Sequence, residues 1–176
     1  MSKSGLQAGE VRATRPGMNV LERLLHVFAL ATYLGSTLAL VLVFLPATSA
    51  LDDDPAAQRR VLARGLRPYN VLSVGALGVL IMSGASSLTE WKQTLGPAYA
   101  RVVWPLAGKL TLTFVLTMVG TWLSFGLAHR LVRAELGALP VEPELQRSMV
   151  KRLVGGGWLA VALAVWTTWV GLNLGH

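Results

Sequence analysis

Long apolar runs alternate with short polar segments along the chain. Four runs have 20 residues or more and almost no charged side chains: 24–45, 69–88, 104–128 and 153–174. The hydrocarbon core of a bilayer is about 30 Å thick, and an α-helix needs roughly 20 apolar residues to cross it. The pattern therefore predicts an all-α protein, an integral membrane four-helix bundle.

The segments outside these runs are too short to form a second folded unit. Residues 1–19 are polar and contain Gly, Ser and Pro, which predicts a mobile tail, and residues 20–176 form the membrane domain. The tail lacks the apolar core of a signal peptide, so we interpret the first run as a helix. In the first link, aspartates and Pro55 precede an arginine-rich run, which predicts a short interfacial helix. The stretch 137–145 contains two prolines and predicts a loop.

Composition supports a membrane protein and excludes several other classes. The chain is 53% hydrophobic and 14% charged, with a mean hydropathy of +0.52, whereas soluble domains carry about 25% charged residues. It contains no cysteine, which excludes disulfides, iron–sulfur clusters and covalently attached c-type haem. The net charge of +7 does not indicate nucleic acid, because basic residues beside membrane helices set orientation and contact anionic lipid. Membrane lipid is the expected partner.

Lysines and arginines are unevenly distributed over the two sides of the predicted bundle. Nine lie in the first and third links and six lie on the opposite side. Because cytoplasmic links carry an excess of positive charge, both termini are predicted to lie outside. The nine are Arg59, Arg60, Arg64, Arg67, Arg130, Arg133, Arg147, Lys151 and Arg152.

Two ionisable side chains lie inside the predicted spans, and such groups are functional candidates because lipid does not solvate them. His26 lies near the start of the first span and Lys109 near the start of the third. Alternate helices of a four-span bundle run parallel, so the two residues are predicted at a similar depth. Met82, near the end of the returning second span, is predicted on the same side. The three side chains form one candidate cluster.

Helical spacing predicts that this histidine faces other helices. His26, Tyr33 and Thr37 are seven and four residues apart, so they share one helix face. Polar and small residues that recur in this way pack against helices rather than against lipid. The third span has such a set at the same period: Lys109, Thr113, Thr117, Gly120 and Ser124.

Each candidate also has a purely structural interpretation. Lys109 can extend to the headgroups from its place near the end of a span. His26 can bond a neighbouring backbone at the interface, and Met82 can be a packing residue. Gly75, Gly78 and Gly84 are interpreted as helix contacts.

The pattern LLHVFALATYLGS, residues 24–36, resembles the first helix of CopD-type copper-resistance membrane proteins and of the related HemJ-type protoporphyrinogen oxidases. In those families an early histidine is followed seven residues later by an aromatic residue and then by small residues, here His26, Tyr33, Gly35 and Ser36. The stretch WPLAGKLTL is similar to their third helix, which has an aromatic residue before an early lysine, here Lys109. The resemblance covers most of the chain.

The resemblance to HemJ-type proteins implies a b-type haem (haem b) at His26. It implies Lys109 near a propionate or in proton transfer, with Tyr33 as a second catalytic candidate and Met82 as a second candidate ligand. If the chain is an enzyme, it implies an oxidoreductase of the protoporphyrinogen oxidase type, and otherwise electron transfer.

The resemblance to CopD-type proteins implies copper binding or transport, with His26 and Met82 as the ligands because imidazole and thioether suit Cu(I). Both families imply a bacterial inner membrane, which would place the two termini in the periplasm. A third hypothesis is an accessory subunit without chemistry of its own, in a homodimer or a larger membrane complex.

Overall fold

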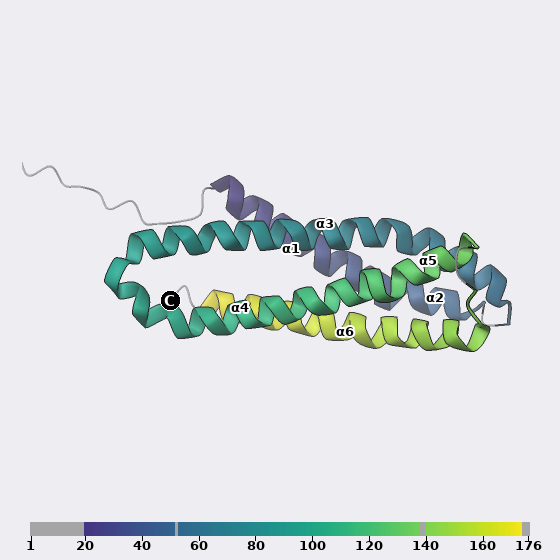
Figure 1. Ribbon diagram of the computed structural model, residues 1–176. Helices are drawn as coiled ribbons and strands as arrows, with labels where there is room; N and C mark the ends of the chain where they lie inside the picture. Colours follow the sequence, from purple (N-terminus) through teal and green to yellow (C-terminus); the bar gives the residue numbers. More distant parts are fainter. Residues whose placement is uncertain (1–19, 52, 138–139, 174–176) are drawn as a thin grey trace, which may run out of the picture.

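The computed structural model describes residues 20–51, 53–137 and 140–173, which form four helical rods that run antiparallel, side by side (Figure 1). Each rod contains a stretch long and apolar enough to cross a membrane. The predicted all-α, four-helix membrane bundle is therefore confirmed. The predicted tail, residues 1–19, lies outside the described residues.

Two of the rods are interrupted by a π-helical segment, in which the backbone bonds reach one residue further than in an α-helix. The first rod comprises α1 (Val20–Ala39), the π-helical segment Leu40–Phe44 and α2 (Leu45–Ser49). The second is α3 (Pro55–Leu95), joined by a 3-10 turn (Gly96–Ala98) to the third. The third comprises α4 (Tyr99–Thr121), the π-helical segment Trp122–Ala128 and α5 (His129–Glu135), and the fourth is α6 (Pro143–Asn173).

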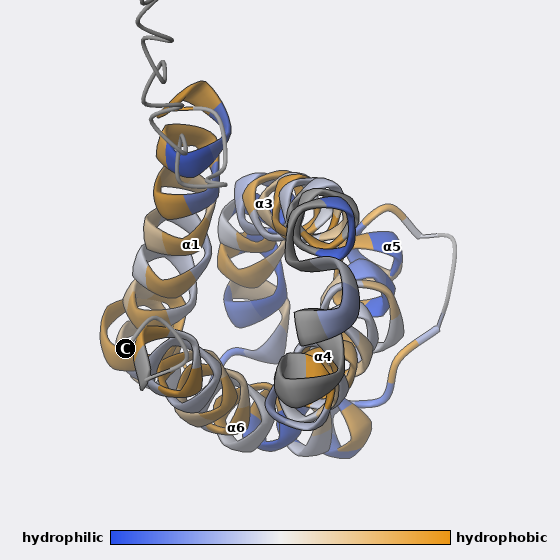
Figure 2. Cartoon of the chain, turned by 90° about the vertical axis from the view of Figure 1, so that its left-hand side faces the viewer, coloured by the Kyte–Doolittle hydropathy of each residue, from blue (hydrophilic) through white to orange (hydrophobic). Residues whose placement is uncertain are grey.

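The rods are arranged as a ring in which each rod packs on two neighbours (Figure 2). The start of α1 and the end of α6 lie at the same end of the bundle (Figure 1), and we call it the His26 end. The opposite end, where α2 leads into α3 and α5 into α6, is the Gln146 end. At the His26 end the first turns of α1 lean away from α6 (Figure 2).

The helices are longer than the sequence predicted. The prediction of a separate interfacial helix before a span at 69–88 is wrong, because α3 is one helix of 41 residues, about 62 Å long at 1.5 Å per residue. Its predicted start is correct: the Asp54 carboxylate accepts hydrogen bonds from two backbone amides of the first turn. Pro68 lies inside this helix. Leu66 and Tyr69 are buried on either side of it, and their packing offsets the backbone hydrogen bond that proline removes.

The other rods also extend beyond the predicted spans. The third span was predicted to begin at residue 104, but α4 begins at Tyr99. The fourth was predicted from 153, but α6 begins at Pro143, a residue type favoured in the first helical turn. The predicted loop at 137–145 is thus shorter, and of it residues 138–139 lie outside the described residues.

Glycines allow α6 to approach two other rods closely. A Cβ atom at Gly157 would collide with the Val41 side chain of the first rod. A Cβ atom at Gly156 would lie 2.7 Å from Leu123 Cδ2 of the third rod. Small residues at such positions let membrane helices gain dispersion contacts that lipid does not offer. These contacts close the deeper part of the bundle.

A network of amide side chains joins the rods at the Gln146 end. Gln146, which is 1% exposed, donates from Nε2 to Gln58 Oε1 at 2.7 Å and to the Pro55 carbonyl at 3.2 Å. Its Oε1 atom accepts from Arg59 Nε at 3.0 Å. Gln58 in turn donates to the Thr48 carbonyl. We call Gln58, Arg59 and Gln146 the glutamine clasp, and it ties α2, α3 and α6 together.

Adjacent glycines of α6 provide a test of the close packing. Gly157→Ala should lower the free energy of unfolding by about 1–3 kcal/mol, because the new methyl group overpacks the contact with Val41. Gly155→Ala, whose Cβ would meet nothing within 4 Å, should raise it by up to about 1 kcal/mol through helix propensity. Chemical unfolding in detergent micelles measures both, and equal effects would contradict the packing.

The glutamine clasp gives a second prediction for stability. Gln146→Ala should lower the free energy of unfolding by about 1–3 kcal/mol, because Gln58 and Arg59 lose their buried partner. Gln93→Ala, at an exposed glutamine of α3, should change it by less than about 0.5 kcal/mol. A Gln146 variant as stable as the Gln93 variant would show that the clasp contributes nothing.

Candidate functional site

The polar faces predicted from helical spacing point into the bundle, but their burial changes with depth. On the first rod, Tyr33 and Thr37 are fully buried, whereas His26 is half-buried. On the third rod, Ser124 is buried and Lys109 is half-buried. The prediction that these faces meet other helices is therefore confirmed at depth. At the His26 end the same faces keep part of their exposure.

Ser83 of α3 orients the imidazole of His26. Its hydroxyl oxygen lies 2.7 Å from His26 Nδ1 and 2.7 Å from the Val79 carbonyl oxygen. A serine hydroxyl has one hydrogen, and the bond to the carbonyl one turn earlier uses it. The imidazole therefore donates from Nδ1–H to Ser83, and this assignment leaves the lone pair on Nε2. No residue that the structure describes bonds to Nε2.

Lys109 lies at the same end of the bundle and is directed at α6. A Cβ atom at Gly171 would lie 3.1 Å from Lys109 Nζ and 3.3 Å from Cε, so the lysine side chain lies across this glycine. Its ammonium group is within electrostatic range of the His26 ring. His26 on α1 and Lys109 on α4 thus lie at the same end of the bundle (Figure 1).

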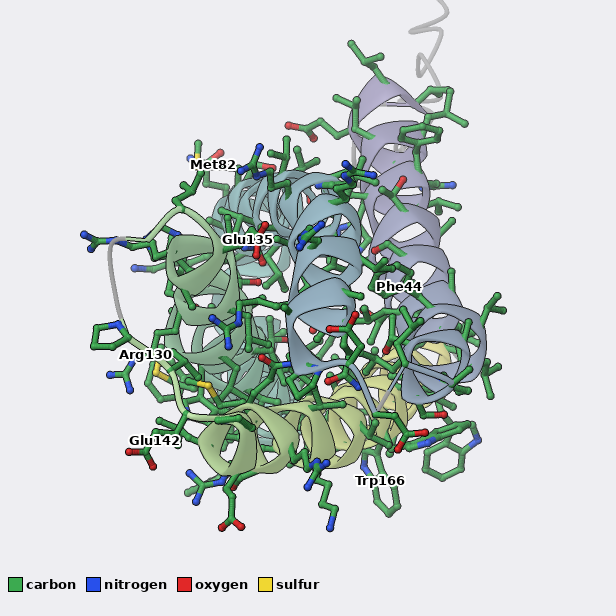
Figure 3. All side chains as sticks on the ribbon, turned by 90° about the vertical axis from the view of Figure 1, so that its right-hand side faces the viewer. Phe44, Met82, Arg130, Glu135, Glu142 and Trp166 are labelled. Carbon is green, nitrogen blue, oxygen red and sulfur yellow. The ribbon has the colours of Figure 1, made fainter. Side chains whose placement is uncertain are left out.

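Met82 directly precedes Ser83, the partner of His26, in α3, and both line one groove. Met82 is 73% exposed and projects away from the bundle (Figure 3). The groove, of about 550 Å³, is also lined by Glu22 and Leu25 of α1, and His26 is not among the lining residues. Gly75 and Gly78 also line this groove, and a Cβ atom at either would meet nothing within 4 Å. Their interpretation as helix contacts is wrong within this chain, because no other rod covers them.

Glu22 is a candidate functional residue that the sequence analysis did not identify. The prediction began the first span at residue 24, whereas α1 and the membrane-spanning stretch both begin at Val20. Glu22 is four residues before His26 and thus on the same helix face. Its Oε2 atom is buried, with no hydrogen-bond partner among the described residues. The spacing of four residues from the histidine was the available signal.

Tyr33 lies deeper than His26, in a separate group of hydroxyls. The two are seven residues apart, which is about 10 Å along the helix axis. Tyr33, Tyr69, Ser73 and Ser124 are all at most 5% exposed. None of the four hydroxyl oxygens has a hydrogen-bond partner among the described residues. A buried polar group without a partner costs about 1–3 kcal/mol, and we call these four residues the hydroxyl cluster.

Comparisons with known proteins found no relative of this chain. No family model, no curated protein and no solved structure matches the chain. Within the described residues, no three His, Cys, Asp or Glu side chains are grouped so that they could hold a metal ion. What the site can bind is therefore argued from its own geometry.

The bond between His26 and Ser83 predicts one tautomer of the histidine. In the wild type, the ¹⁵N chemical shifts of His26 should report a proton on Nδ1 and none on Nε2. Ser83→Ala removes the acceptor, so the shifts should move toward a mixture of tautomers. Ser86→Ala, one turn further along α3, should leave them unchanged. Wild-type shifts that report the proton on Nε2 would contradict the assignment.

Proposed function

We propose that the protein binds a b-type haem through Nε2 of His26. The observation that carries the proposal is the hydrogen bond from His26 Nδ1 to Ser83. Histidines that ligate metals generally donate their other ring N–H to a fixed acceptor, which sets the tautomer and the ring orientation. Here the half-buried ring has that acceptor, and its second nitrogen has a lone pair for iron.

The neighbouring residues fit such a group. Haem iron takes an axial imidazole ligand, and bound haem supplies one-electron chemistry. The ammonium group of Lys109, within electrostatic range of His26, would pair with a propionate or hold a proton. Tyr33 is fully buried and two turns deeper, so its hydroxyl would hold a proton further inside the bundle. The activity that the resemblance implies is protoporphyrinogen oxidation, and electron transfer is the simpler role.

Charge supports an orientation for the bundle. The exposed basic residues of the described chain include eight at the Gln146 end, and cytoplasmic segments carry such an excess. We therefore propose that this end faces the cytoplasm and the His26 end the periplasm of a bacterial inner membrane. The eight are Arg60, Arg64, Arg67, Arg130, Arg133, Arg147, Lys151 and Arg152.

The two alternative functions differ in their support. For copper, Met82 is 73% exposed and projects outward (Figure 3), which makes it a weak candidate for a ligand inside the bundle. The uncovered Gly75 and Gly78 support the role of an accessory subunit, because small residues let a helix of another membrane protein approach closely. Stoichiometric co-purification of another membrane protein, with full activity in a His26→Ala/Lys109→Ala double variant, would favour the subunit.

An absorption spectrum tests the haem proposal. Protein purified in detergent from cells supplied with haem precursor should show a Soret band, and His26→Ala should lose it. Ser83→Ala should weaken haem affinity about 10–100-fold, as loss of the partner of a ligating histidine does. His129→Ala, at an exposed residue of α5, is the matched control and should keep the band.

Two results would contradict this function. One is a colourless wild-type protein after expression with ample haem. The other is a Soret band of equal strength in the wild type and in His26→Ala. Circular dichroism of each variant shows whether loss of the band reflects loss of the ligand or of the fold.

A further inference from the structure

The hydroxyl cluster brings side chains of three rods to one level of the bundle. Tyr33 of the first rod lies close to Tyr69 of α3. The Tyr69 hydroxyl is directed toward Ser73 and Thr37 but does not reach hydrogen-bonding geometry with either, so it has no partner among the described residues. The Tyr33 hydroxyl would lie 3.1 Å from a Cβ atom at Gly120 on α4.

Ser124 belongs to the same level, one helical turn beyond Gly120 and on the same face. It lies in the π-helical segment of the third rod, a type of local widening that occurs often at functional sites. The other π-helical segment, Leu40–Phe44, begins three residues after Thr37 of the first rod. Both irregular segments therefore adjoin the hydroxyl cluster.

The uncharged hydroxyls of the cluster indicate what kind of ligand it can bind. Each hydroxyl can both donate and accept a hydrogen bond, and none of the buried residues that the structure describes is charged. An ion at this level would have no opposite charge to balance it. Water has the matching pattern of donors and acceptors, and buried water typically makes about three hydrogen bonds to such groups.

We propose that the hydroxyl cluster binds ordered water, which enters from the His26 end. The polar side chains on the inward faces between that end and the cluster are half-buried: His26, Lys109, Thr113 and Thr117. They run beside leucines that are at most 8% exposed: Leu77, Leu80 and Leu116. On the side toward the Gln146 end, leucines that are at most 4% exposed follow directly: Leu66, Leu127 and Leu153. Water thus reaches the middle of the bundle from one side and stops there. This inference goes beyond the haem proposal and does not depend on it.

The chain contains no cysteine, so single cysteines can report on water along α4 and its continuation. Thr117→Cys and Ser124→Cys lie on the proposed path, Leu127→Cys lies in the leucine layer, and Phe114→Cys is an exposed position on the lipid side. Only the thiolate form of a cysteine reacts with a small, cationic methanethiosulfonate. In a dry apolar site the thiol stays protonated, so the reaction is slow. The full-length protein in liposomes is treated with this reagent.

Thr117→Cys and Ser124→Cys should react at least about tenfold faster than the other two variants, because water supports the thiolate there. Equal rates for Ser124→Cys and Phe114→Cys would overturn the proposal, because they would show a dry cluster. Equal rates for Ser124→Cys and Leu127→Cys would overturn the one-sided path.

A second measurement applies if a cysteine variant does not fold. Tyr69→Phe removes one hydroxyl and keeps the ring. If water binds that hydroxyl, the variant loses a hydrogen bond and its unfolding midpoint falls. If the cluster is dry, the variant loses an unsatisfied buried group and its midpoint rises, which would overturn the proposal. Tyr99→Phe, at the first residue of α4, serves as the control. Because neither readout involves haem, failure of this proposal and failure of the haem proposal are distinguishable.

Discussion

Lipid offers no hydrogen-bond partner, so every polar side chain within the membrane must find one inside the bundle. This constraint orders the structure into levels along one axis. His26 meets Ser83 near one end, the hydroxyl cluster lies deeper, and the glutamine clasp ties the rods at the other end. Between the first two levels, the hydroxyls of Thr113 and Thr117 donate to backbone carbonyls of their own helix.

The two halves of the bundle differ in packing, and that difference determines where chemistry can occur. Toward the Gln146 end, glycines of α6 fit against Val41 and Leu123, and the core leucines are almost fully buried. Toward the His26 end, α1 leans away from α6 (Figure 2). His26 and Lys109 therefore project from rods that the tight half holds in place, yet they keep the partial exposure that a ligand requires.

The π-helical segment of the third rod, Trp122–Ala128, marks the boundary between these halves. Before it, the inward face has Lys109 and two threonines beside the buried Leu116, and after it the buried residues are Leu131, Val132 and Ala134. Within it, the amide of His129 donates to the Ser124 carbonyl, five residues earlier. One extra residue per turn rotates the following face, so the polar stripe ends at the hydroxyl cluster instead of crossing the bundle.

Much of the fold follows from the sequence alone, because length and hydropathy decide whether a helix can cross a bilayer. The four spans and the inward face of Tyr33 and Thr37 are of this kind. The helix ends depend on tertiary contacts: α3 continues through Pro68 because Leu66 and Tyr69 on either side of it are buried by other rods. The partner of His26 and the outward face of Met82 also depend on how α1 crosses α3. Such contacts join residues far apart in the chain, and helical periodicity holds no information about the rotation of one helix against another.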